Sequence, residues 1–241
     1  MIRVHSGAAM FVRYAYPPNE LGYCGPPDPG ALLRASDEVQ LREIAEQFDG
    51  AWCYLETLAA GTGHADPLDE RVVEAYWLGS PLLERLDGNE FSRAVTRRFR
   101  NEYGARMAGL AGPGGADAPA RAHHGFHVFE VYPWARLLER GAGAHALSIL
   151  DQCRIRWGVV TEVAEDRAAV RSRGLHWDGR RLTLGVERTE HPRLPAGHVR
   201  VRPGDHVAMH WDWICDRLTQ RQVAQLRGRT AQQLVLANRK V

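Results

Sequence analysis

Apolar side chains recur at helical spacing in the first third of the chain. Asp37 and Gln40 form the capping-box sequence that is typical of a helix start. Apolar residues then follow at steps of three and four positions, namely Leu41, Ile44, Ala45, Phe48, Trp52, Leu55 and Leu58. A stripe with this period covers one face of an α-helix. The pattern therefore predicts a single helix of about 20 residues behind Asp37.

Further helix starts are marked by a capping side chain directly before a proline. Asp66-Pro67 and Ser80-Pro81 both have this form, and proline is favoured at the first helical position. An apolar face over residues 89–110 predicts another helix. Residues 11–30, in contrast, are rich in proline, glycine and aromatic side chains, so we predict an ordered loop there.

From residue 155 onward the pattern changes from helical to strand-like. Short β-prone runs, separated by glycine, aspartate and proline turns, lie at residues 155–163, 168–173, 181–187 and 206–213. The pair Asp178-Gly179 is a strong hairpin signal. A polar helix is expected over residues 219–227, after the last strand.

Together these elements predict an α+β protein with two domains. We expect an N-terminal all-helical domain at residues 1–145, followed by a small OB-like β-barrel with a C-terminal helix at residues 150–241. The boundary between them is expected near residues 141–150, where the helical pattern stops.

The distribution of charge supports this division. Residues 146–241 carry 17 basic and 10 acidic side chains, whereas residues 1–145 carry 14 and 19. A basic domain favours acidic partners, but its arginines alternate with apolar residues, so nucleic acid is not the partner that we expect. No run of 18 apolar residues suggests a membrane span. The first residues lack the layout of a secretory signal, so we expect a cytoplasmic protein.

The four cysteines, Cys24, Cys53, Cys153 and Cys215, form no C-x-x-C pair. The sequence therefore predicts neither a zinc knuckle nor a thioredoxin-like motif. Scattered thiols in such a chain are expected to be reduced.

One candidate site lies in the helical region, in the segment HHGFHVFE at residues 123–130. On a helix, His123, His127 and Glu130 share one face, a geometry that binds metals. On a strand, His127 would lie opposite Glu130 and the set would not form. A hydrogen-bonded structural role is the alternative for all three. Cys24, in a loop rich in aromatic residues, is a candidate nucleophile or ligand that could line a pocket with these histidines, or the loop could simply plug the helical bundle.

A second constellation lies in the C-terminal region. It opens with CRIRWGVVTEV at residues 153–163 and closes with VRPGDHVAMHWDWICDRL at residues 201–218. Together and in this order, the segments resemble the HypC-type nickel–iron hydrogenase maturation chaperones over about residues 150–230. Members of that family have an opening cysteine, a glycine in the first strand, a Gly-Asp turn, a strand with a histidine, and a helix preceded by leucine.

The resemblance implies a metal-binding role for two residues. In that family the opening cysteine ligates the iron of an Fe(CN)2CO unit and the strand histidine lies near it. The matching positions are Cys153 and His210. A thiolate is a soft ligand for such iron, and an imidazole can ligate it or donate a hydrogen bond beside it. The family's cysteine follows the initiator methionine, whereas Cys153 is internal.

The resemblance implies a non-catalytic accessory factor in hydrogenase maturation. It would bind an iron-ligand intermediate, the hydrogenase large subunit or another maturation protein. The iron-binding hypothesis requires the first strand to lie beside the strand around Met209–Trp211. An alternative is an enzyme in the helical domain, with Cys24, His127 and Glu130 as candidate catalytic residues, that supplies a ligand or small molecule to the maturing metal centre. A third possibility is a barrel reused for protein contacts with no hydrogenase link. The alternative for Cys153 is an inert, semi-buried thiol, and for His210 a hydrogen-bonded histidine on a strand.

Overall fold

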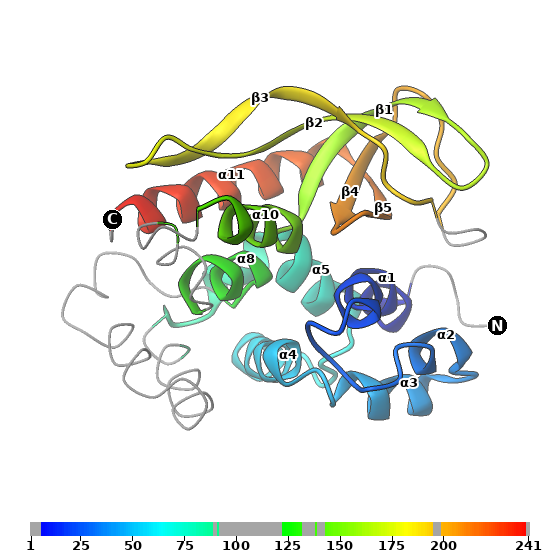
Figure 1. Ribbon diagram of the computed structural model, residues 1–241. Coiled ribbons are helices and arrows are strands. Elements are labelled where there is room, and N and C mark those ends of the chain that lie inside the picture. The colour runs from blue at the N-terminus through cyan, green and yellow to red at the C-terminus, as the bar shows by residue number, and fades with distance from the viewer. Residues whose placement is uncertain are drawn as a thin grey trace. The chain divides into compact units, whose positions relative to one another are not determined.

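The computed structural model describes residues 6–88, 91, 122–131, 138, 143–194 and 199–239. The chain is a mixed α+β protein that divides into two compact units, Met1–Val131 and Tyr132–Val241 (Figure 1). We refer to them as the helical unit and the sheet unit. The boundary predicted near residues 141–150 lies C-terminal to this division. The helix predicted over residues 89–110 falls, apart from Phe91, outside the described residues.

In the part of the helical unit that is described, the secondary structure is helical throughout. Its elements are α1 (Gly7–Glu20), α2 (Ala31–Arg34), α3 (Glu38–Ala45), α4 (Asp49–Thr62), α5 (Glu70–Leu78), the 3-10 turn η1 (Pro81–Arg85), α8 (His124–Phe126) and the π-helical turn η3 (His127–Val131).

Helix α1 shows that the prediction of a loop from residue 11 was wrong. Ser6 caps the helix by accepting a hydrogen bond from the backbone N–H of Ala9 at 3.2 Å. Pro17 and Pro18 lie in the last turn, and proline disfavours a helix because it lacks the N–H donor. Packing of the apolar face outweighs that penalty. Only residues 21–30 form the expected loop, which Asn19 holds by donating to the carbonyl of Cys24 at 2.8 Å.

The single long helix predicted behind Asp37 is in fact two helices, α3 and α4. The predicted start is confirmed, because Asp37 accepts the backbone N–H of Gln40 at 2.9 Å. The break falls at residues 46–48, where Phe48 leaves the helical conformation and remains buried. Its ring meets Phe11 edge-on at 5.4 Å. Because Phe48 is still buried in the core, the apolar period of the sequence continues through the break. The period alone therefore cannot show that the helix is interrupted.

The capping predictions for the next two elements had different outcomes. Ser80 caps η1 as expected, with the N–H of Leu82 at 3.2 Å from its hydroxyl. Helix α5 begins later than predicted, because Asp69 and not Asp66 is its N-cap. The core around these elements is strongly aromatic, and Tyr14 stacks on Trp77 with ring centroids 5.4 Å apart.

The sheet unit contains a five-stranded antiparallel sheet in the order β3-β2-β1-β4-β5. Its elements are α10 (Gly143–Cys153), β1 (Arg156–Val163), β2 (Ala168–Trp177), β3 (Leu182–Glu190), β4 (His206–His210), β5 (Trp213–Leu218) and α11 (Gln220–Asn238). The hairpin at Asp178-Gly179 is confirmed, with Gly179 at φ +95°. The single strand predicted over residues 206–213 is two strands joined at Trp211.

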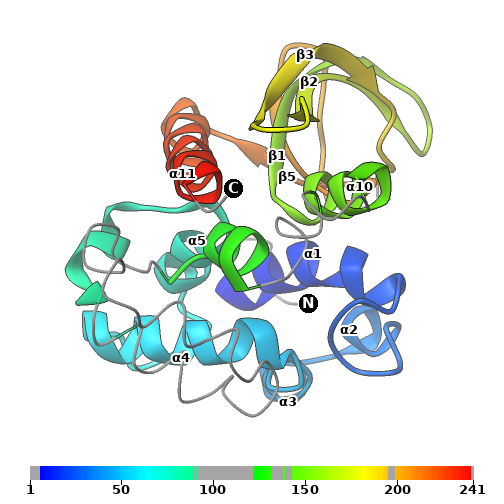
Figure 2. The ribbon, with the colours of Figure 1, turned by 60° about the vertical axis from the view of Figure 1, so that its left-hand side comes forward.

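The sheet is curled but not closed by a continuous ladder. Irregular registers interrupt three of its strand pairs, and such bulges bend a sheet. Arg193, after β3, forms two single bridges, one antiparallel to Arg167 before β2 and one parallel to Trp213 of the outer strand β5. The apolar interior consists of Val160, Ala168, Val170, Val207, Met209 and Ile214. Figure 2 shows the curled sheet with α10 across one end.

Helix α11 is longer than the predicted 219–227 segment and runs along the β2–β3 hairpin (Figure 1). A capping box between Thr219 and Gln222 starts it. At its other end, the Asn238 side chain exchanges two hydrogen bonds with the backbone of Leu182, each 2.8 Å long. None of the helices described is both long and apolar enough to cross a membrane.

Candidate functional site

Cys153 and His210 lie next to each other in the sheet unit. Cys153 is the last residue of α10 and His210 is the last residue of β4. Their ligand atoms lie within 4.8 Å of one another, and both side chains are buried. Thiolate sulfur and imidazole nitrogen bind metals at about 2.3 Å and 2.0–2.1 Å respectively. One metal ion could therefore be ligated by both residues.

The strand pairing explains why residues so far apart in the sequence meet. Strand β1 pairs with β4, with Arg156 opposite Met209 and Trp157 opposite Ala208. This is the adjacency that the iron-binding hypothesis requires. A further backbone hydrogen bond runs from the N–H of Trp211 to the carbonyl of Gln152 at 2.9 Å. It links the residue after His210 to the residue before Cys153.

The backbone geometry explains why glycine occupies one position in each of the two segments, 153–163 and 201–218. A Cβ on Gly158 would lie 2.7 Å from the carbonyl oxygen of Arg171 on β2, so no larger residue fits there. Gly204 adopts φ +93°, and Asp205 accepts the N–H of Arg202 at 3.0 Å. The Gly-Asp pair thus forms the turn that leads into β4, as expected from the sequence.

Trp211 has the only positive φ of a non-glycine residue in the described part of the chain, at 53°. A bulky side chain rarely adopts this conformation, and the strain costs about 1–3 kcal/mol. The conformation makes the turn from β4 into β5. It persists because both backbone groups of Trp211 are held, the N–H by Gln152 and the carbonyl by Arg156 at 2.6 Å.

A network of charged residues, centred on the buried Asp151, surrounds the end of α10. Asp151 is paired through Oδ1 with Arg154 at 2.9 Å and through Oδ2 with Arg188 at 2.9 Å. Arg188 also pairs with Glu190 at 3.2 Å. Burial would raise the pKa of Asp151, but Arg154, Arg156, the backbone N–H of Leu175 and Arg188 together hold it below its usual value. Asp151 is therefore a carboxylate at neutral pH.

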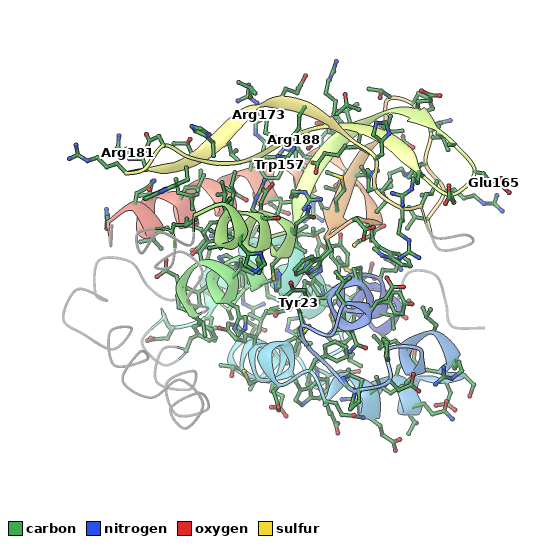
Figure 3. The ribbon with its side chains drawn as sticks, in the orientation of Figure 1. Tyr23, Trp157, Glu165, Arg173, Arg181 and Arg188 are labelled. Carbon is green, nitrogen blue, oxygen red and sulfur yellow. The ribbon has the colours of Figure 1, made fainter. Side chains whose placement is uncertain are left out.

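This network attaches α10 to the sheet where β1 no longer covers β2. Beyond Ser172, strand β2 has no β1 partner. There the carbonyl of Arg173 accepts from Arg154 at 2.7 Å, and the N–H of Leu175 donates to Asp151 at 2.9 Å. Side chains of the α10 segment thus replace a strand partner. Figure 3 labels Arg173 on β2 and Arg188 on β3, the strands that this network joins.

The predicted metal-binding set of the helical unit is not gathered at one point. Among the described residues, His123, His127 and Glu130 form no group of three ligand atoms. His123 is the N-cap of α8, with its Nδ1 accepting the N–H of Phe126 at 3.3 Å. The segment from His127 to Val131 is π-helical. A π-helical turn is wider than an α-helical one, so the i, i+4, i+7 alignment does not apply.

The candidate catalytic residues of the helical unit have properties of a packed core. Nδ1 of His127 lies 3.2 Å from the hydroxyl of Tyr54. Burial, together with His124, lowers the pKa of His127 to about 3, so the imidazole is neutral at pH 7. Glu130 is buried as well. Burial raises the pKa of Cys24 to about 12, and a protonated thiol is a poor nucleophile.

The chain is thus an α+β protein whose sheet unit holds a buried cysteine–histidine pair beside a charge network centred on the buried Asp151. The chain matches, over residues 3–241, the model of a family of unknown function (DUF6390), and it belongs to that family. Neither the curated proteins nor the solved structures include a significant match to it.

Proposed function

We propose that this protein is an accessory factor in the maturation of nickel–iron hydrogenases and binds an iron-ligand intermediate through Cys153 and His210. The observation that carries the proposal is the proximity of these two ligand atoms, within 4.8 Å. They are the two positions that the resemblance to HypC-type chaperones assigns to metal binding. The hydrogenase large subunit or another maturation protein would receive the intermediate.

The topology of the sheet unit supports the proposal. A five-stranded Greek-key barrel of the OB type matches the strand order β3-β2-β1-β4-β5, provided that the outer strands meet. The parallel bridge between Arg193 and Trp213 lies where such a barrel would close. We therefore propose an OB-like barrel with α11 as its C-terminal helix.

The chemistry of the pair suits a soft metal centre. A cysteine binds iron as the thiolate and gives up its proton on binding. A neutral imidazole can ligate the same metal or hydrogen-bond to one of its ligands. Because Cys153 ends a helix fixed by Asp151 and Arg154, its sulfur has a defined position. A defined position of the sulfur favours specific binding of the iron unit. In this respect Cys153 differs from the family's cysteine, which lies at the N-terminus.

The proposal is tested in cells that make a nickel–iron hydrogenase and depend on this protein. Cys153→Ser should abolish hydrogenase activity while the protein's abundance and fold remain unchanged. Cys215→Ser is the matched control, because Cys215 is another buried cysteine of the sheet unit and lies on β5. Full maturation with Cys153→Ser would refute iron binding at this site and leave a docking role for the sheet unit.

A further inference from the structure

Arg156 contacts the chain on both sides of the cysteine–histidine pair. Its side chain is 2% exposed. Nη1 donates to the carbonyl of Asp151 at 3.2 Å and to Oε1 of Gln152 at 2.8 Å. Nη2 donates to the carbonyl of Trp211 at 2.6 Å. One guanidinium therefore joins the end of α10, which carries Cys153, to the turn that follows His210.

A backbone hydrogen bond closes this connection into a ring. The N–H of Trp211 donates to the carbonyl of Gln152, and Arg156 donates to both of these residues. The strained φ of Trp211 directs its N–H and carbonyl to these partners. Strain of this kind persists only where the surrounding contacts determine the conformation, and it is common at functional sites.

We propose that Arg156 is a positioning residue that holds Cys153 and His210 at the separation needed to bind one metal ion. The inference rests on the proposed function only in requiring that these two residues bind metal. Without Arg156, the carbonyls of Asp151 and Trp211 lose a buried donor, and the end of α10 is held less rigidly against the turn that follows β4. The entropic cost of fixing Cys153 and His210 in place would then have to be met when the metal binds, and the affinity would fall.

The geometry requires arginine rather than lysine. A guanidinium presents several donors in a rigid plane, whereas an ammonium is a single point of charge on a flexible stem. Arg156 uses Nη1 and Nη2 for acceptors on opposite sides of the site. Its charge also lies 3.5 Å from Glu190. Arg156→Lys therefore retains the charge beside Glu190 and removes the two-sided contact.

The test measures binding of Co²⁺ to the full-length protein under anaerobic conditions. Thiolate-to-cobalt charge-transfer absorption reports whether the sulfur is a ligand, and titration gives the affinity. Arg156→Lys should weaken Co²⁺ binding by about 10- to 100-fold, the usual effect of removing a residue that orients a ligand, and should reduce the charge-transfer band. Arg171→Lys is the control, because Arg171 is an exposed arginine of β2 that pairs with Glu187 at 3.1 Å, outside the charge network.

Each outcome has one meaning. A folded Arg156→Lys protein with wild-type affinity and absorption overturns the positioning role. If Arg156→Lys does not fold, Gln152→Ala removes one acceptor of Arg156 at a half-buried position and should still lower the affinity; no change with that variant also overturns the role. Cys153→Ser separates the two proposals. Unchanged Co²⁺ binding with Cys153→Ser refutes the metal site itself, whereas lost binding with Cys153→Ser and normal binding with Arg156→Lys refutes positioning alone.

Discussion

The helical unit and the sheet unit bury polar side chains in different ways. In the helical unit, the buried histidines are close to tyrosine hydroxyls or backbone donors, as His127 is to Tyr54. In the sheet unit, the buried groups include ions, and Asp151 is balanced by arginines from three segments. A neutral imidazole needs only a hydrogen bond when buried, but a buried charge needs a partner of opposite sign.

This difference indicates where a function can be built. The imidazoles near tyrosine rings complete an aromatic core, and burial keeps that of His127 neutral by lowering its pKa. The charge network fixes α10 on the sheet and leaves Cys153 and His210, two good metal ligands, side by side. Buried polarity in the helical unit therefore supports packing, whereas in the sheet unit it also holds a site together.

The largest effect is expected from removing the centre of the charge network. Asp151→Ala leaves Arg154 and Arg156 buried without this carboxylate, and breaking a buried ion pair costs about 3–5 kcal/mol. Hydrogen exchange should show this loss in the amides of the sheet unit and little change in the helical unit. Glu165→Ala, at an exposed turn on the opposite end of the sheet from Arg181 (Figure 3), is the control. Equal, small effects of both substitutions would contradict the role of the network.

Acid should affect the helical unit first. The pKa of His127 is lowered by burial to about 3, so the unfolded chain binds a proton at a higher pH than the native protein. The contribution of His127 to the free energy of unfolding is complete above the pKa of the unfolded chain, about 6.5. It declines by up to about 1.4 kcal/mol per pH unit as the pH falls toward 3. The pKa of Asp151 is also lowered, so protonation of this carboxylate reduces the stability of the sheet unit only below about pH 4.

The two units can therefore be compared by hydrogen exchange between pH 7 and pH 4.5. The helical unit of the wild-type protein should lose stability over this range. His127→Asn keeps an amide near Tyr54 but cannot be protonated, so it should flatten the pH dependence. If His127→Asn retains the wild-type pH dependence, another group is responsible.

The sequence predicted the architecture better than the site. The change from helical to alternating pattern, the Asp178-Gly179 turn and the cap at Ser80 depend on local residues, and each is present. Helix α1 was missed because its prolines outweighed its apolar face, and the break at Phe48 was missed because the apolar period continues through it.

The candidate pair could be found only through the family resemblance. Cys153 and His210 are 57 positions apart in the numbering, and no local pattern relates them. The network around them was not found, because Asp151 meets partners from β2 and β3 only after the sheet has formed. The signal available in the sequence was a pair of arginines, Arg154 just before a short β-prone run and Arg156 within it. The structure buries both of them.

The smallest effect concerns the attachment of α11, which again distinguishes the sheet unit by its polar contacts. Asn238 donates one hydrogen bond to the backbone of Leu182 and accepts another, and each such bond contributes about 1 kcal/mol. Asn238→Ala should therefore destabilise the sheet unit by about 2 kcal/mol. Asn238→Asp should destabilise it by at least as much, because a carboxylate oxygen would face the carbonyl of Leu182 where the amide now donates. Denaturant unfolding followed by exchange at the amide of Leu182 measures both. No loss with either variant would mean that α11 is held by its apolar face and not by this residue.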